Sequence, residues 1–239
     1  MRVFTMQSES VVSKTSSNLS SIACEQEHVA QPPPSKRRKT SNAESDIGCT
    51  TKTASANDNG ESEVMRLEII EATGDFFDAP QNTLLVHACN CEGSWGAGIA
   101  KAFKQKYPKA YKEYANHCDE LHHGLIGKAQ LILPVDHEKN SKVPKHFIGC
   151  LYTSRGKGRR KDSATSILGA SKPAMNDLLT KAKAWNEKAA CDEDKIKEVR
   201  MCKINSGLFA VPWDKTKAAL ETINGSNYGF VTIEVVSPG

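Results

Sequence analysis

The sequence predicts an α/β sandwich with a largely parallel central sheet over about residues 64–239. Three observations lead to this fold class. Short β-rich segments alternate with longer segments of helical spacing. The segment 84–89 is apolar along its length, as in strands that are buried on both faces. Small or polar residues follow three of the predicted strands, at 74–75, 87–90 and 205–210. Ligands bind outside the carboxyl ends of the strands in such sheets, so these strand ends are expected to line one crevice.

The individual elements follow from hydrophobic periodicity and from residues that break it. Residues 64–72 alternate between apolar and polar side chains and predict a first strand, which ends at Gly74. Further strands are predicted at 84–89, 128–134, 146–153, 199–204 and 229–236. Helices are predicted at 97–106, 108–121, 166–185 and 215–223, and a polar surface insertion at 186–197. Pro108 either kinks one long helix or starts a second helix at its first position.

Residues 1–63 differ in composition from the rest of the chain. They are rich in Ser and Thr, contain three consecutive prolines at 32–34, and have Phe4 as their single aromatic residue. Such a segment cannot bury enough apolar surface to offset the entropy lost on ordering, so we expect a disordered tail. The remaining residues 64–239 are enough for one domain with a proper core.

A basic cluster, Lys36-Arg37-Arg38-Lys39, follows the prolines of this tail. The net charge of the whole chain is only +4, which gives no strong reason to expect a nucleic-acid site. An exposed basic cluster is typical of segments that a nuclear import receptor reads, although a solvated run of charge is the alternative. We therefore expect the protein in both nucleus and cytoplasm.

The sequence gives little reason to expect a membrane-spanning segment, a secretory signal or a metal site. No apolar run approaches the ~18–20 residues that span a bilayer, and the N-terminus lacks the apolar region of a secretory signal. The eight cysteines are scattered, and the close pair Cys89 and Cys91 has no second pair to complete a zinc site. Reduced thiols in an intracellular protein are the better interpretation. We expect neither a metal nor a cofactor.

The segment 84–101 is the clearest candidate for a binding site. Polar residues at 87–90 end an apolar strand, and glycines at 93, 96 and 98 precede a helix. The first N–H groups of a helix lack intrahelical partners and lie at the positive end of its dipole, which predicts a phosphate-bearing ligand. A dinucleotide fingerprint fits poorly, because no glycine lies three residues beyond Gly98. A P-loop is excluded, because no Gly-Lys-Ser/Thr follows the glycines.

Four separated blocks resemble the macrodomain family, the ADP-ribose-binding α/β/α fold, and within it the fungal ADP-ribose 1''-phosphate phosphatases. The blocks are Gly74-Asp75-Phe76, His87-Ala88-Cys89-Asn90-Cys91, Gly93-Ser94-Trp95-Gly96-Ala97-Gly98-Ile99-Ala100 and Ile204-Asn205-Ser206-Gly207-Leu208-Phe209-Ala210-Val211-Pro212-Trp213. Their order and approximate spacing agree with the family over about residues 64–236. The resemblance implies a three-layer α/β/α sandwich with a mixed, mostly parallel sheet. It also implies hydrolysis of ADP-ribose 1''-phosphate to ADP-ribose and phosphate, which the family connects to tRNA splicing.

The resemblance assigns binding roles as well. Asp75 would accept a hydrogen bond from the adenine amino group, Asn90 would hold the distal ribose hydroxyls, and Phe209 would pack against that ribose. Two glycine-containing loops would surround the phosphates with backbone N–H groups. The expected substrate-binding residues are Gly74, Asp75, Phe76, Ala88, Cys89, Asn90, Trp95, Gly96, Ala97, Gly98, Ile99, Ala100, Ile204, Asn205, Ser206, Gly207, Leu208, Phe209 and Ala210.

His87 and Asn90 are the expected catalytic residues, acting on a water molecule near the scissile phosphate. Phosphomonoester hydrolysis needs an in-line nucleophile, a proton for the leaving oxygen and stabilisation of charge on the equatorial oxygens. Histidine is the best side chain for proton transfer near neutral pH, although a histidine late in a buried strand can equally be a core residue. Cys89 is disfavoured as the nucleophile, because the C-x5-R loop of cysteine phosphatases is absent.

Two other functions stay open. A related macrodomain branch releases ADP-ribose from modified carboxylate side chains, using a lysine and an aspartate three residues before a tryptophan. The residue at that distance from Trp213 is Ala210, which disfavours this activity without excluding it. A non-catalytic ADP-ribose-binding module would need the loops but no reactive side chain. An ADP-ribosylated protein is therefore a possible partner beside the small-molecule substrate.

Residues 155–161 carry five positive charges in seven positions. They are either a solvated loop or a mobile lid that attracts a substrate with three phosphates. In the second case, replacing Arg159 and Arg160 is expected to raise the KM.

Overall fold

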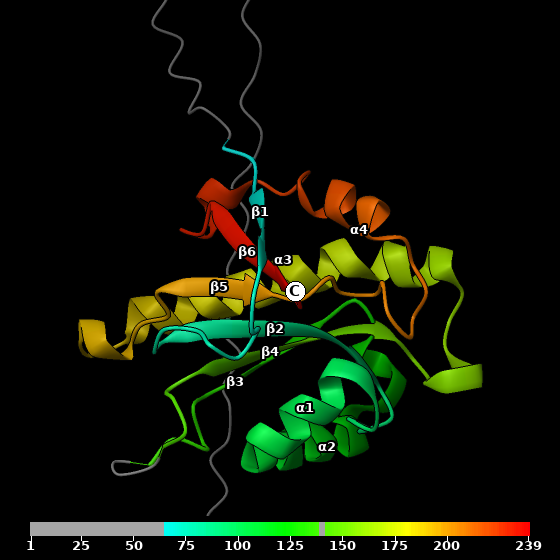
Figure 1. The fold of residues 1–239 in the computed structure, drawn as a ribbon, viewed down its shortest axis with the longest axis horizontal. Helices are drawn as coiled ribbons and strands as arrows, with labels where there is room; N and C mark the ends of the chain where they lie inside the picture. The colour runs from blue at the N-terminus through cyan, green and yellow to red at the C-terminus, as the bar shows by residue number, and fades with distance from the viewer. Residues whose placement is uncertain (1–64, 139–141) are drawn as a thin grey trace, which may run out of the picture. The chain divides into compact units, whose positions relative to one another are not determined.

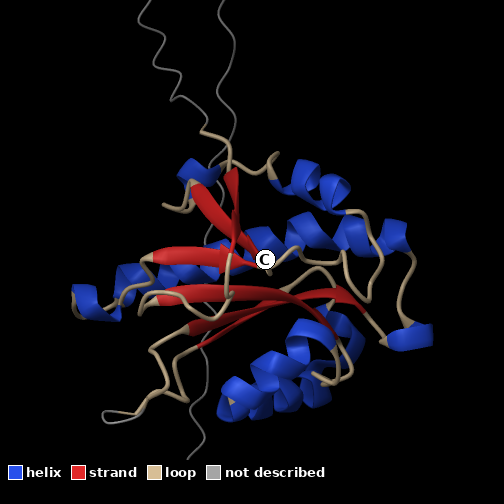
Figure 2. Cartoon of the chain, viewed as in Figure 1, coloured by secondary structure: helices blue, strands red, loops and turns tan. Residues whose placement is uncertain are grey.

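The computed structural model describes residues 65–138 and 142–239. These residues form a three-layer arrangement in which helices cover both faces of one sheet (Figures 1 and 2). The predicted tail and its basic cluster at 36–39 lie outside the described residues. None of the helices in the two described ranges combines the length and the apolar character needed to cross a membrane.

The central sheet has six strands in the order β1-β6-β5-β2-β4-β3. The strands are β1 (Glu68–Thr73), β2 (Thr83–Asn90), β3 (Ala129–Ile132), β4 (Phe147–Ser154), β5 (Glu198–Met201) and β6 (Thr232–Ser237). All neighbouring pairs are parallel except β3 and β4, so the sheet is mixed and mostly parallel, as predicted. The middle strand β2 is the apolar segment of the sequence, and it is buried at nearly every residue.

Helices α1 (Gly98–Lys106) and α2 (Pro108–Leu121) cover one face of the sheet, and α3 (Ala164–Lys188) and α4 (Trp213–Leu220) cover the other (Figure 1). Pro108 stands at the start of α2, so the second of the two alternatives is correct. Proline is favoured there because the first N–H of a helix has no intrahelical partner. Single-turn 3-10 helices occupy His122–Leu125, Gly158–Arg160, Asp192–Asp194 and Gly225–Asn227.

The side chains of β2 alternate between two cores. Leu84 and Val86 pack in a large aliphatic cluster with α3, which includes Leu178. Leu85 and Cys89 belong to a second cluster on the side of α1 and α2, which is rich in aromatic residues. Because successive side chains of a strand point to opposite faces, each residue of β2 is assigned to one core or the other.

The strand β5 is shorter than predicted. The apolar pattern predicts a strand over 199–204, but pairing ends at Met201 and the chain then turns. The reason is local. The Ile204 N–H donates to the Cys202 carbonyl at 2.6 Å, and a backbone that turns in this way cannot pair with a neighbouring strand. The early end of β5 brings residues 202–209 to the edge of the sheet where β2 and β4 also end.

Candidate active site

A cavity of about 760 Å³ opens at the carboxyl ends of β2, β4 and β5. Three segments supply its walls: the end of β2 with the loop into α1, the loop after β4, and the loop after β5. The lining residues are Ala88, Asn90, Ser94, Gly96, Ala97, Gly98, Ile99, Ala100, Lys157, Gly158, Cys202, Lys203, Ile204, Asn205, Ser206, Gly207, Leu208 and Phe209. Of the three strand ends predicted to line one crevice, those at 87–90 and 205–210 line this cavity and the one at 74–75 does not.

The N-terminus of α1 forms one wall of the cavity. No side chain caps this helix, so the N–H groups of its first turn remain available to a ligand. Gly98 has a φ of +56°, a conformation that suits glycine, and it lets the chain turn sharply into the helix. A side chain at this position would meet Leu208 of the facing loop, because an added Cβ would lie 3.7 Å from the Leu208 Cδ1. The two loops therefore stand close together with little side-chain bulk between them.

The loop after β5 is held by the buried side chain of Asn205. Its Oδ1 accepts a hydrogen bond from the Thr153 hydroxyl of β4 at 2.9 Å, and its Nδ2 donates to the Ser171 hydroxyl of α3 at 2.8 Å. Ser171 in turn donates to the Ile167 carbonyl at 2.8 Å. Asn205 also has a φ of +65°, which an asparagine tolerates better than most residues. The side chain thus fixes the loop while its backbone turns toward the cavity.

Asn90 shapes the loop that follows β2. Its Nδ2 donates to the Ser94 carbonyl at 2.7 Å, and its Oδ1 accepts from the Glu92 N–H at 2.9 Å. The Asn90 carbonyl accepts from the hydroxyl of Tyr114 in α2 at 2.6 Å. An amide nitrogen has two hydrogens, so one N–H of Asn90 is still free to donate into the cavity that the residue lines.

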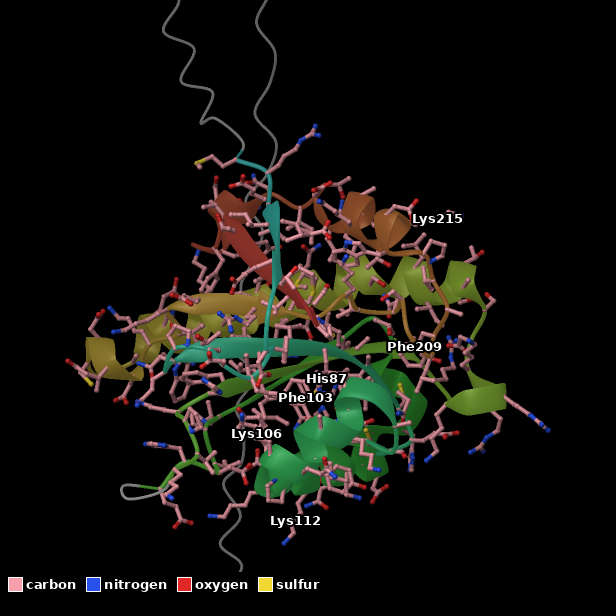
Figure 3. The ribbon with its side chains drawn as sticks, in the orientation of Figure 1. His87, Phe103, Lys106, Lys112, Phe209 and Lys215 are labelled. Carbon is pink, nitrogen blue, oxygen red and sulfur yellow. The ribbon has the colours of Figure 1, made fainter. Side chains whose placement is uncertain are left out.

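The structure places His87, one of the two expected catalytic residues, outside the cavity wall. Its ring is fully buried and lies beside Phe103 of α1 (Figure 3). The two rings stack with their centres 4.1 Å apart, and Trp95 packs against the edge of the imidazole at 4.8 Å. The strand places Ala88 and Asn90 toward the cavity and His87 on the opposite face. The imidazole therefore does not line the cavity, and the alternative of a core histidine fits its surroundings.

A cluster of His87, Cys89 and Cys150 lies in the same core. Their potential ligand atoms are within 4.8 Å of one another, so these are the described residues that could hold a metal ion. Burial, however, raises the pKa of the Cys89 thiol well above its ordinary value. A thiol that stays neutral is a poor ligand and a poor nucleophile. The cluster is consistent with packing, and the Cys89 thiol does not line the cavity.

The turn after β1 lies beside the cavity walls and is not among them. The Oδ1 of Asp75 accepts from the Phe77 N–H at 2.9 Å, so this carboxylate forms a local turn while the side chain remains exposed. Phe76 and Phe77 pack on Phe103, with ring centres 5.6 and 5.1 Å away. These contacts tie the turn to α1, whose first residues line the cavity.

The charge of the cavity wall is positive. Lys157 and Lys203 are the two charged residues among the described lining residues, and neither Asp nor Glu is present there. Lys203 pairs with Glu71 of β1 at 3.0 Å, and Lys217 pairs with the same carboxylate at 2.9 Å. Hydrogen bonds from Lys217 and Lys203 lower the pKa of Glu71 to about 2. The wall is thus suited to an anion and unsuited to a metal ion held by carboxylates.

The basic loop at 155–161 connects the other two cavity loops. Arg160 pairs with Glu92 of the loop after β2 at 3.0 Å. Lys161 donates to the Leu208 carbonyl of the loop after β5 at 2.8 Å. The basic run therefore lies at the cavity, where a lid would have to lie, and its role as a mobile lid rather than a solvated loop stays a prediction.

The comparison with known families agrees with this geometry. Residues 86–220, more than half of the chain, match the family model described as "Macro domain". The chain belongs to the macrodomain family. The described fold is similar to two solved macrodomains of DarG. For that of Mycobacterium tuberculosis the TM-score is 0.53 with 20% identity, covering 72% of this chain and 99% of that one. For that of Thermus aquaticus the TM-score is 0.52 with 20% identity, covering 71% and 98%.

Relatives of this macrodomain by sequence include several fungal proteins. A Chaetomium globosum protein named "ADP-ribose 1''-phosphate phosphatase" is 48% identical over 160 residues, which cover 66% of this chain and 85% of that protein. Proteins with the same name from Neosartorya fischeri and Candida albicans are 35% and 34% identical, covering 64% and 67% of this chain and 89% and 96% of those proteins.

Most, but not all, of the residues expected to bind substrate line the cavity of this macrodomain. The exceptions are Gly74, Asp75, Phe76, Cys89, Trp95 and Ala210. Five further residues line the cavity without having been predicted as site residues, namely Ser94, Lys157, Gly158, Cys202 and Lys203. The basic run at 155–161 was the available signal for two of them. Cys202 and Lys203 fell within a predicted strand, so no signal marked them.

Replacing Asn205 with alanine is expected to lower the free energy of unfolding by about 2–4 kcal/mol, measured by urea denaturation. The change removes two buried hydrogen bonds, leaves the Thr153 hydroxyl without its acceptor and places alanine, which tolerates this region less well than asparagine, at a φ of +65°. Asn205→Gly is the matched control. It loses the same hydrogen bonds without the backbone strain, so it should be more stable than Asn205→Ala by about 1 kcal/mol. Wild-type stability of the alanine variant would contradict the role of this side chain.

Proposed function

We propose that this macrodomain is a phosphatase that hydrolyses ADP-ribose 1''-phosphate to ADP-ribose and inorganic phosphate. One observation carries the proposal: the cavity is walled by the uncapped N-terminus of α1, by the glycine-containing loop after β5 and by two lysines, with no carboxylate among its described lining residues. Such a wall suits a ligand with several phosphates. The names of the fungal relatives, which are 34–48% identical and almost fully covered, support the same substrate.

The order of the strands suggests how the substrate lies. The turn with Asp75 follows β1 at one end of the sheet, and β2 and β4 lie toward the other end. In the proposed arrangement adenine lies near Asp75, and the diphosphate lies between the N-terminus of α1 and the loop at 206–209. The distal ribose and its phosphate then lie near Asn90, toward the loop after β4.

The proposed reaction uses water as the nucleophile. A water oxygen forms a bond to phosphorus, the bond from phosphorus to the 1'' oxygen breaks, and one proton of the water ends on the departing oxygen. The departing group is a hemiacetal oxygen, which leaves more readily than an ordinary alkoxide because the ring oxygen withdraws electron density. Catalysis of phosphoryl transfer is mainly positioning and charge stabilisation. The free N–H of Asn90, the first turn of α1 and the loop at 206–209 are the groups that supply them here.

We also infer that the enzyme acts in nucleus and cytoplasm and removes a metabolite of tRNA splicing. The support for this is the resemblance of the sequence to the fungal enzymes and the basic cluster at 36–39, which a nuclear import receptor would bind.

The activity is tested by incubating the full chain with ADP-ribose 1''-phosphate and, separately, with a protein ADP-ribosylated on carboxylate side chains. The expected result is release of inorganic phosphate from the first and little ADP-ribose from the second. Asn90→Ala is the matched variant, with kcat expected to fall about 100-fold because one positioned donor is lost. ADP-ribose release as the main activity would instead establish a de-ADP-ribosylase. Tight binding of ADP-ribose with no turnover of either substrate would establish a binding module.

His87 is expected to be dispensable for the chemical step. Methionine has a similar volume and adapts its shape, so His87→Met should keep the core packed against Phe103. The expected kcat is within about tenfold of the wild type, whereas loss of a general acid or base costs about 100-fold or more. Thermal unfolding of the same samples shows whether the variant is folded. A 100-fold loss of kcat in a folded variant would restore His87 as the group that transfers the proton.

Removing residues 36–39 from a fluorescently tagged full-length protein is expected to lower its nuclear fraction. A tagged variant that lacks an equal number of residues elsewhere in 1–63 controls for the change in length. An unchanged distribution of the 36–39 deletion would refute import through this cluster.

A further inference from the structure

We propose that Lys157 selects the terminal phosphate of the substrate, so that a ligand with a phosphomonoester on its distal ribose binds more tightly than ADP-ribose itself. This inference rests on the proposed function, because it identifies the group that contacts the third phosphate.

Lys157 differs from the other lysine of the cavity in its electrostatic environment. The charge of Lys203 is compensated by Glu71, which lies 3.0 Å away. The ammonium of Lys157 has no ion pair or side-chain hydrogen bond with any residue in the described ranges 65–138 and 142–239. It is therefore the uncompensated cation of the cavity wall. A third phosphate group beside Lys157 would therefore be attracted by a positive charge that no carboxylate compensates.

The position of Lys157 along the sheet points to the terminal phosphate. Strand β2 lies between β5 and β4, so the loop that carries Lys203 and the loop that carries Lys157 stand on opposite sides of Asn90. Lys203 is on the side of β1, where the adenine is proposed to lie. Lys157 is on the far side, beyond the distal ribose. The diphosphate lies between the two and is already surrounded by backbone N–H groups.

The loop that carries Lys157 is fixed by its own hydrogen bonds. The Ser154 hydroxyl donates to the Gly156 carbonyl at 2.8 Å and accepts from the Asp162 N–H at 3.0 Å. The Lys157 carbonyl accepts from the Arg160 N–H at 3.0 Å. The next residue, Gly158, has a φ of +57° and also lines the cavity. The backbone of Lys157 is therefore held at the cavity, and its exposed side chain is long enough to reach a ligand there.

The other basic residues of the loop have different surroundings. Arg160 is occupied by Glu92 and Lys161 by the Leu208 carbonyl, so each holds the loop against a neighbouring loop. Arg159 is exposed and does not line the cavity. The sequence suggested Arg159 and Arg160 as the residues that set KM, and the geometry moves that role to Lys157.

The test compares two ligands in Lys157→Ala and in the matched control Arg159→Ala, which removes the same charge from the same loop. At 0.15 M salt the Debye length is about 8 Å, so long-range attraction contributes little. In Lys157→Ala the KM for ADP-ribose 1''-phosphate is expected to rise about tenfold or more, the effect of losing one charge-assisted hydrogen bond. The Ki of ADP-ribose as a competitive inhibitor should change less than about twofold. Lys157→Arg should retain the preference, and Arg159→Ala should change neither constant.

Equal weakening of both ligands in Lys157→Ala, or no change in either, would overturn the proposal. Equal effects of Lys157→Ala and Arg159→Ala would also overturn it, because they would show a general effect of loop charge. A wild-type protein that releases no phosphate would refute the proposed function alone. ADP-ribose 1''-phosphate would then persist in the sample, and calorimetric titration of both ligands into the same three variants would test the role of Lys157 directly.

Discussion

The buried amide of Asn205 joins the loop after β5 to β4 and to α3. The cavity exists because three loops that are distant in the sequence meet at one edge of the sheet, and this amide fixes the one that departs furthest from regular structure. A buried polar group without partners costs about 1–3 kcal/mol. The Oδ1 and the Nδ2 of Asn205 both have hydrogen-bond partners. The side chain therefore avoids this free-energy penalty and anchors the loop. The backbone strain at its φ of +65° is offset by these contacts.

Side-chain hydrogen bonds and ion pairs also hold the other two loops. The groups that take part become more exposed from the loop after β2 to the loop after β4. Asn90 folds the loop after β2 through its amide, and its carbonyl accepts from Tyr114 in the core. The loop after β4 relies on Ser154 and on ion pairs at the surface, such as Arg160 with Glu92. Exposed ion pairs contribute little stability, about 0–1 kcal/mol. The loops after β2 and β5 are thus held from the core, whereas the basic loop is held by its own hydrogen bonds and by surface ion pairs.

The sequence was sufficient to predict the elements whose signals are local. The apolar run of β2, the proline that begins α2 and the glycines before α1 are patterns within a few residues, and the structure contains all three elements. The small and polar residues at 205–210, which follow a predicted strand, indicated the second loop of the site, and the family resemblance assigned its residues to substrate binding. The end of β5 was placed too late because a continuous apolar pattern over 199–204 does not show where the backbone turns.

The side chain of His87 shows why a sequence alone misplaces a catalytic group. Strand periodicity separates Ala88 and Asn90 from His87 and Cys89, and that separation was available from the start. Both faces of β2 are buried, however, so the sequence gives no sign of which face continues into the cavity. The answer depends on α1 and α2 packing their aromatic residues over one face. Lys157 presents the opposite case. The run of like charges at 155–161 does not show which of its charged residues lines the cavity.

The segment between β4 and α3 has a modular construction. Ser154 closes its first turn, and Ser163 caps α3 by accepting a hydrogen bond from the Ser166 N–H at 3.2 Å. Both ends are therefore completed by residues that lie outside 155–162, and little of the hydrophobic core depends on what lies between them. A segment of this kind can change length and charge during evolution while the fold persists. It offers a place to exchange one ligand preference for another by grafting a loop onto an unchanged scaffold.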